Sequence, residues 1–306
     1  MIQPITNVKA GILLMLCVTL FNGLHNLASA QPPDLPISVG DSGVGYIDTA
    51  VISNQLRFRF DAAYGANQSN RAEFLWAWRP ALGPGPPLDE SSTDYQKMSA
   101  YLEHTVNSHL SVFMEAGAIF SNPEVNDNSG GLGDIETGFK VALYEDCDTF
   151  ATFQMRVYVP SGDADRALGN GHVSLEPAIL IYQKIGSFTL EGELRDWIPI
   201  GGTPGRQGNV LRYGLGMSTD LCSIGLPSVR PVVEFAGWTV LDGQTRFLSP
   251  SGLVVEDADG VTVVNVKVGS RFILDENHDL YVGYGRSLTG DRWYRDILRV
   301  DLRLRF

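Results

Sequence analysis

Residues 133–144, GDIETGFKVALY, decide the fold of this 306-residue chain. Apolar and polar residues alternate along the stretch. One face carries Ile135, Thr137, Phe139, Val141 and Leu143, and the other carries Asp134, Glu136, Gly138, Lys140 and Ala142. A period of two residues is typical of a β-strand whose two faces meet different surroundings. The stretch therefore predicts a strand with one apolar and one polar side.

The same alternation recurs through most of the chain. It is clear in residues 108–120, 149–159, 187–195, 261–272 and 295–306. No stretch of comparable length after residue 30 shows the 3.6-residue period of an amphipathic helix. The fold class that follows is all-β.

The connections between these stretches alternate in length. Short ones lie near residues 107–108, 145–148, 184–187, 219–223 and 275–277, and long Gly-, Pro- and Asp-rich ones lie at 80–94, 121–131, 160–171, 198–208 and 241–260. Tight turns at one end and long loops at the other are typical of an up-and-down antiparallel transmembrane β-barrel, with periplasmic turns and external loops.

A soluble β-sandwich or barrel with an apolar core is the competing interpretation. Three features favour the membrane barrel: Arg, Glu and Gly on the polar face, stretches of about ten or more residues, and a C-terminal aromatic, Phe306, on the apolar face. That ending resembles the C-terminal sorting signal of bacterial outer-membrane barrels. About 12 strands are expected, with about 14 as the alternative. Roughly thirteen candidate strands can be counted over residues 55–306, whereas single-chain bacterial barrels normally have an even number. Either residues 43–51 therefore add a strand, or the hairpin 55–79 lies partly outside the wall.

Composition narrows the class of protein further. Hydrophobic residues make up 44% of the chain and charged residues 19%, with a formal net charge of −12. These values exclude a disordered chain and a polytopic helical membrane protein. The acidic balance argues against nucleic acid as a partner.

The N-terminal residues read as an export signal. The apolar run 11–21 follows Lys9 and precedes Ala28-Ser29-Ala30, which is the pattern of a cleaved signal peptide. We therefore expect a signal peptide over residues 1–30, a Pro- and Gly-rich leader over 31–54 and the barrel over 55–306. A barrel of this kind in a Gram-negative bacterium has outer-membrane lipid and the barrel-assembly machinery as partners.

The polar faces of the strands predict the lining of the lumen. The predicted residues are Glu136, Lys140, Arg156, Tyr158, Glu176, Glu191, Glu193, Arg195, Arg212, Arg230, Glu234, Lys267, Arg271, Arg299 and Arg303. Opposite charges on adjacent strands can pair and hold the barrel round, or they can form a constriction that selects solutes by size and sign. Both roles can hold together.

Tryptophans near the predicted outer ends of the strands could determine which solutes the outer mouth of the barrel accepts. Counting alternate residues along each strand places Trp197, Trp238 and Trp293 on the polar, lumen-facing side. There they would give the outer mouth of the barrel an apolar lining. A one-residue bulge would instead turn them outward into the membrane. Trp76 and Trp78 share the apolar face, as an interfacial girdle requires.

Two further pairs of residues could form a disulfide or a hydrolase site. Cys147 and Cys222 fall in predicted periplasmic turns, where a disulfide is a possible pairing. His172 and Ser174 have the His-x-Ser spacing of outer-membrane lipid hydrolases, but they point inward and Leu175-Glu176 replaces the Asn-Gly of those enzymes. No catalytic set, metal site or cofactor motif is expected.

Three short motifs resemble the outer-membrane transporters named after the MetA pathway of phenol degradation. They are Gly131-Leu132-Gly133-Asp134, Val159-Pro160-Ser161-Gly162-Asp163, and Gly169-Asn170-Gly171 before Ser174-Leu175-Glu176-Pro177. The resemblance covers residues 131–202 and implies an outer-membrane barrel that moves small, often apolar compounds. It carries over no binding residue.

The sequence thus predicts a non-enzymatic, porin-like outer-membrane channel or transporter for small molecules, with hydrophobic or aromatic solutes favoured. The alternative is a structural or adhesive surface barrel with a plugged lumen. An outer-membrane lipid hydrolase comes third.

Overall fold

A computed structural model describes residues 42–66, 70–71, 74–75, 85–88, 90, 92–202, 207–221, 224–249, 252–290 and 292–306. The barrel lies in the compact unit formed by residues 37–305. Within the described ranges, no helix is long and apolar enough to cross a membrane.

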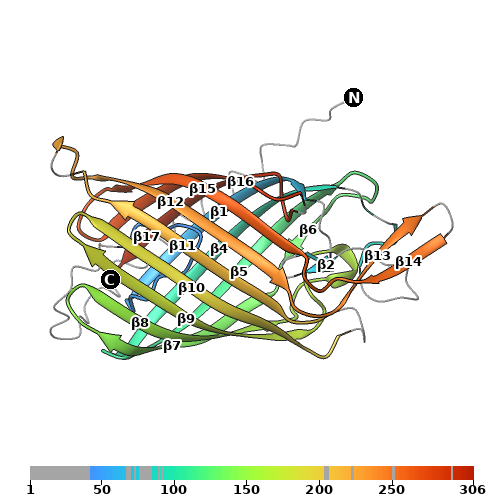
Figure 1. The fold of residues 1–306 in the computed structure, drawn as a ribbon, viewed down its shortest axis with the longest axis horizontal. Coiled ribbons are helices and arrows are strands. Elements are labelled where there is room, and N and C mark those ends of the chain that lie inside the picture. The colour runs from blue at the N-terminus through green and yellow to red at the C-terminus, as the bar shows by residue number, and fades with distance from the viewer. Residues whose placement is uncertain are drawn as a thin grey trace. The chain divides into compact units, whose positions relative to one another are not determined.

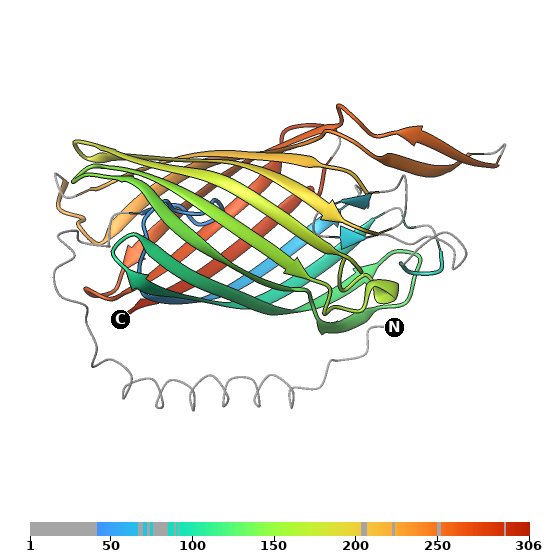
Figure 2. The same cartoon turned by 90° about the horizontal axis from the view of Figure 1, so that it is seen from below.

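Twelve antiparallel strands close into a barrel (Figures 1 and 2). They are β1 (Gln55–Ala66), β4 (Thr93–Asn107), β5 (Leu110–Pro123), β7 (Ile135–Glu145), β8 (Thr149–Val159), β9 (Val173–Ile185), β10 (Phe188–Ile200), β11 (Val210–Thr219), β12 (Val229–Val240), β15 (Thr262–Ile273), β16 (His278–Ser287) and β17 (Asp296–Arg305). Strand β1 closes the barrel because Gln55 is in register with both Arg305 of β17 and Glu103 of β4. The prediction of a 12-stranded antiparallel barrel is confirmed.

The remaining elements lie outside this closed wall. β6 (Ser129–Leu132) pairs with the end of β5, and β13 (Gln244–Ser249) and β14 (Gly252–Asp257) form a hairpin that projects beyond the long-loop end (Figure 1). β2 (Asn70–Arg71) pairs only with β3 (Phe74–Leu75). A short 3₁₀ turn, η1 (Ala164–Arg166), lies in the loop between β8 and β9.

Strand β9 shows which of the two alternating faces points outward. Ile179 and Ile181 are 43% and 52% exposed, whereas Glu176 and Leu180 are completely buried. The exposed side chains form an apolar outer surface that suits lipid, and the intervening ones fill the interior.

The described part of the leader, residues 42–54, adds no strand to the wall and runs inside the barrel instead (Figures 1 and 2). Asn54 lies at the short-turn end, where its side chain accepts hydrogen bonds from the Thr105 N–H and hydroxyl. Ser42 contacts Glu191 and Arg303, also toward the short-turn end. The leader therefore enters the lumen and turns back within it, with residues 45–48 deepest.

A lumen that contains the leader as the candidate solute pathway

Wall carboxylates hold the backbone of the leader. Glu234 accepts the N–H groups of Gly45, Tyr46 and Ile47 at 3.0, 2.9 and 3.0 Å. A carboxylate that meets consecutive backbone N–H groups is well stabilised. Two more acids act similarly: Glu191 accepts Ser42 Oγ and Gly43 N, and Glu193 accepts Asp48 N.

Wall arginines bind the carbonyl groups of the same segment. The bonds run from Arg271 to Gly43 and Val44, from Arg299 to Gly45 and from Arg303 to Ser42, at 2.5–3.1 Å. Together the acids and arginines satisfy a segment that has no secondary structure of its own, as buried backbone requires.

The Asp48 side chain meets a cationic pocket of the wall. Its Oδ2 lies 2.5 Å from Arg156 Nη2, 2.8 Å from Arg195 Nη2 and 3.2 Å from Gln154 Nε2. Beyond it, Lys140 donates to the Thr49 carbonyl and Thr152 to the Ala50 carbonyl.

Two glycines of β11 make room for the leader. A Cβ added at Gly214 would lie 2.4 Å from Ile47 Cγ2, and one added at Gly216 would lie 2.5 Å from Val44 Cγ1. Val44 and Ile47 are themselves 3% and 2% exposed. The leader is therefore packed as well as hydrogen-bonded, and any larger residue at either glycine would clash with it.

The predicted lumen residues fall into two main ion-pair groups. Glu136, Arg156, Glu176, Arg195, Glu193 and Arg212 form one group around Asp48. Arg271 and Arg303 share Asp279 in the other, which also contains Arg57, Asp301 and Arg305. Lys140 pairs with Glu103, Arg299 with Asp61 and Arg230 with Asp220.

Several of these partners were missed by the sequence prediction. Asp48, Asp61, Glu103, Asp279 and Asp301 are all buried inside the barrel. Alternation along the last strand does place Asp301 on the polar face, and the same alternation could have placed Asp61, Glu103 and Asp279 there. It offers no signal for Asp48, which lies outside any strand.

Aromatic side chains gather where the strands approach the long loops. Trp197, Trp238 and Trp293 are 3%, 6% and 5% exposed and belong to one buried cluster. Tyr158 packs edge-on against Trp197, and Trp238 packs edge-on against Trp293. These three tryptophans therefore face the interior of the barrel, and no bulge turns them outward into the membrane. Trp76 and Trp78 lie outside the described residues.

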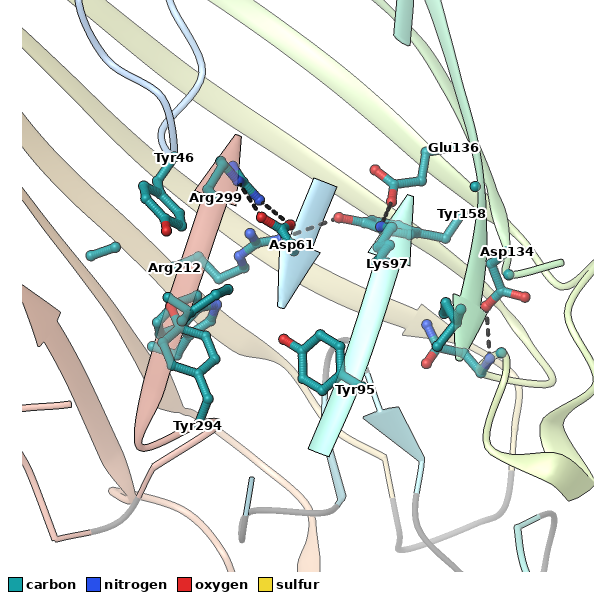
Figure 3. Close-up of a pocket in the computed structure, with 18 of the residues that line it drawn as sticks. Tyr46, Asp61, Tyr95, Lys97, Asp134, Glu136, Tyr158, Arg212, Tyr294 and Arg299 are labelled. Carbon is teal, nitrogen blue, oxygen red and sulfur yellow. Dashed lines mark hydrogen bonds and ion pairs between the residues drawn. The ribbon is translucent and has the colours of Figure 1, made fainter. Parts of the chain in front are cut away.

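A cavity of about 100 Å³ lies between this cluster and the leader. Its lining includes Tyr46, Tyr95, Tyr158, Trp238 and Tyr294 together with the charged groups Asp61, Lys97, Asp134, Glu136, Glu193, Arg212, Lys267 and Arg299 (Figure 3). The ring of Tyr46, which belongs to the leader, has Lys267 Nζ and Arg299 Cζ 4.0 and 4.3 Å from its centroid. The cavity combines aromatic surface with both signs of charge, as solute pockets commonly do.

The three motifs of the family resemblance meet at one edge of this cavity. Asp134 accepts the N–H groups of Gly162 and Asn170 at 2.9 and 2.7 Å, and Ser161 Oγ donates to the Gly133 carbonyl. Burial raises the pKa of the Asp134 carboxyl above its ordinary value, although both N–H groups favour the anion. A Cβ at Gly169 would lie 2.4 Å from Asp134 Oδ1. The motifs therefore anchor the β8–β9 loop.

The His-x-Ser pair and the two cysteines singled out from the sequence do not line the solute cavity. His172 and Ser174 are 5% and 0% exposed inside the barrel, and His172 Nδ1 contacts the Asn170 carbonyl. Cys147 is exposed in the β7–β8 turn, and Cys222 lies outside the described residues, so their disulfide stays a prediction. In the part of the chain that the structure describes, no group of three or more His, Cys, Asp or Glu residues could hold a metal ion.

Comparison with known proteins supports the class of the fold. No protein-family model and no curated protein matches this sequence. A crystal structure of an outer membrane channel from Pseudomonas putida F1 matches with a TM-score of 0.59 at 9% identity, over 91% of this chain and 100% of that one. The NanC porin matches with a TM-score of 0.49 at 9% identity, over 82% and 98%. The chain therefore shares the fold of that Pseudomonas putida F1 protein, a closed antiparallel β-barrel.

Proposed function

We propose that this protein is an outer-membrane channel for small organic molecules, whose conductance is limited by its own leader. The observation that carries the proposal is the cavity of about 100 Å³, lined by aromatic and charged side chains and bounded by Tyr46 of the leader. Below the cavity, the leader is held by hydrogen bonds and ion pairs to the wall and by the packing of Val44 and Ile47 against β11. The hydrogen bonds of this segment can be exchanged for bonds to water, so displacement of the leader would open the lumen.

The proposal includes a cellular setting. Residues 1–30 direct export and are removed, the barrel-assembly machinery inserts residues 55–306, and outer-membrane lipid covers the apolar face. Membership of the MetA-pathway transporters and a preference for aromatic or hydrophobic solutes belong to the same proposal. They rest on the three motifs that anchor the β8–β9 loop and on the tryptophan cluster.

A structural or adhesive barrel with a plugged lumen is the second candidate. It is favoured by the number of hydrogen bonds that hold residues 42–50 in the lumen. In that case the leader would be a permanent core of the barrel.

Conductance of the purified, folded mature chain in planar bilayers separates the two. A channel is expected to show discrete openings, together with liposome swelling in small neutral solutes. Closed behaviour in both assays, at the low voltages where known porins conduct, would overturn the channel and leave the structural barrel.

A further inference from the structure

The contacts of Asp48 resemble those of a bound ligand more than those of a wall residue. Its carboxylate meets Gln154 and Arg156 of β8 and Arg195 of β10, so all three partners belong to the barrel. Two guanidinium groups and an amide are the donors that proteins use to bind carboxylates.

The wall holds these donors in place without help from the leader. Glu136 lies 2.6 Å from Arg156 Nη1, and Glu176 lies 2.9 Å from Arg195 Nη1. Gln154, Arg156 and Arg195 are 0%, 7% and 3% exposed. Because wall carboxylates orient both arginines, the site would keep its shape if Asp48 moved away.

The same site adjoins the solute cavity. Glu136 and Glu193, which contact Arg156 and Arg195 respectively, both line the cavity. A solute that passes from the cavity toward the short-turn end would therefore reach the arginines that Asp48 occupies.

We propose that Gln154, Arg156 and Arg195 form a binding site for small organic carboxylates in transit, and that Asp48 of the leader occupies this site in the closed barrel. The inference rests on the proposed channel function and adds to it a class of solute and a mechanism of competition. A carboxylate that binds the arginines displaces Asp48 and loosens the leader at its deepest point.

Formate binding to an Asp48→Ala variant tests the site directly. The substitution removes the carboxylate and leaves the arginines, so sodium formate should fill the vacated position. Calorimetric titration in detergent micelles, at constant ionic strength with sodium chloride, measures the affinity without requiring any current. Formate is expected to bind Asp48→Ala about tenfold or more tightly than the wild-type protein, and formamide should bind neither.

Two double variants locate the binding site. Asp48→Ala/Arg195→Gln should lose the gain in formate affinity, whereas Asp48→Ala/Arg230→Gln should keep it, because Arg230 pairs with Asp220 elsewhere on the wall. Equal formate affinity in the wild-type protein and a folded Asp48→Ala variant would overturn the inference, as would equal loss in both double variants. Formate binding without any conductance would support the site and count against the channel alone.

Discussion

The Glu234 carboxylate accepts the backbone N–H of Tyr46 at 2.9 Å, across 188 residues of sequence. The same carboxylate also accepts the N–H groups of Gly45 and Ile47 and the Tyr281 hydroxyl. Glu234 itself is fully buried. A buried carboxylate is costly without donors, so the leader and Glu234 stabilise each other. This mutual dependence makes the leader sensitive to single changes in the wall.

Neutralising Glu234 should loosen the leader. Glu234→Gln keeps an acceptor but removes the charge, and hydrogen bonds to a charged group contribute about 1.5–3 kcal/mol. We expect the open time in single-channel recordings to rise about tenfold or more. Glu115→Gln is the matched control, because Glu115 pairs with Arg59 on the wall. Equal open times in the two variants would show that Glu234 does not hold the channel closed.

Filling the recess for the leader should have a similar effect by a steric route. Gly216→Val places a side chain where even a Cβ would lie 2.5 Å from Val44. The leader must shift, so we expect a larger conductance and faster proteolysis of the leader in a barrel that remains folded. Gly290→Ala, which has open space around its Cβ position, controls for the loss of a glycine. A leader as protected as in the wild-type protein would contradict the packing described above.

Buried wall pairs should contribute more to stability than pairs near the turns. Arg57 and Asp301 are 2.5 Å apart with side chains 5% and 0% exposed, whereas Arg230 and Asp220 are 15% and 26% exposed. Asp301→Ala leaves a buried guanidinium without its closest partner and should lower the free energy of unfolding by about 3–5 kcal/mol. Asp220→Ala should cost about 1 kcal/mol or less. Urea titration followed by gel mobility measures both, and comparable losses would argue against this ranking.

Removing the anchor of the β8–β9 loop should expose that loop to protease. Asp134→Ala deletes the acceptor of the Gly162 and Asn170 N–H groups, while the strands on either side keep their pairing. We expect trypsin to cleave after the exposed Arg166 several-fold faster than in the wild-type protein. Asp165→Ala, in the same loop, serves as the control. An unchanged cleavage rate for Asp134→Ala would mean that other contacts hold the loop.

The strand residues show why the wall was predictable. Along β7, Phe139 is exposed and Lys140 is buried, as alternation in GDIETGFKVALY requires. A strand has only two faces, so one apolar residue indicates the side of every neighbour. The same alternation predicts that Arg195, Glu234 and Arg271 face the interior, and all three are buried there.

The leader shows where that reasoning stopped. Residues 43–51, GVGYIDTAV, have no clear period, and their hydrogen-bond partners on the wall lie 91 to 254 residues away in the chain. The residues around Asp48 in the sequence do not distinguish it from a solvent-exposed acid. Its buried position depends on ion pairs with Arg156 and Arg195, which lie on separate strands.

By itself, the sequence determined an antiparallel barrel with an apolar outside and a charged inside, because strand periodicity is a local property. Only the tertiary structure decided that residues 42–54 lie inside the lumen and that Trp197, Trp238 and Trp293 face inward. It also decided which charges pair with one another and which hold the leader. Those outcomes depend on the closure of β1 against β17, which brings distant side chains within hydrogen-bonding distance.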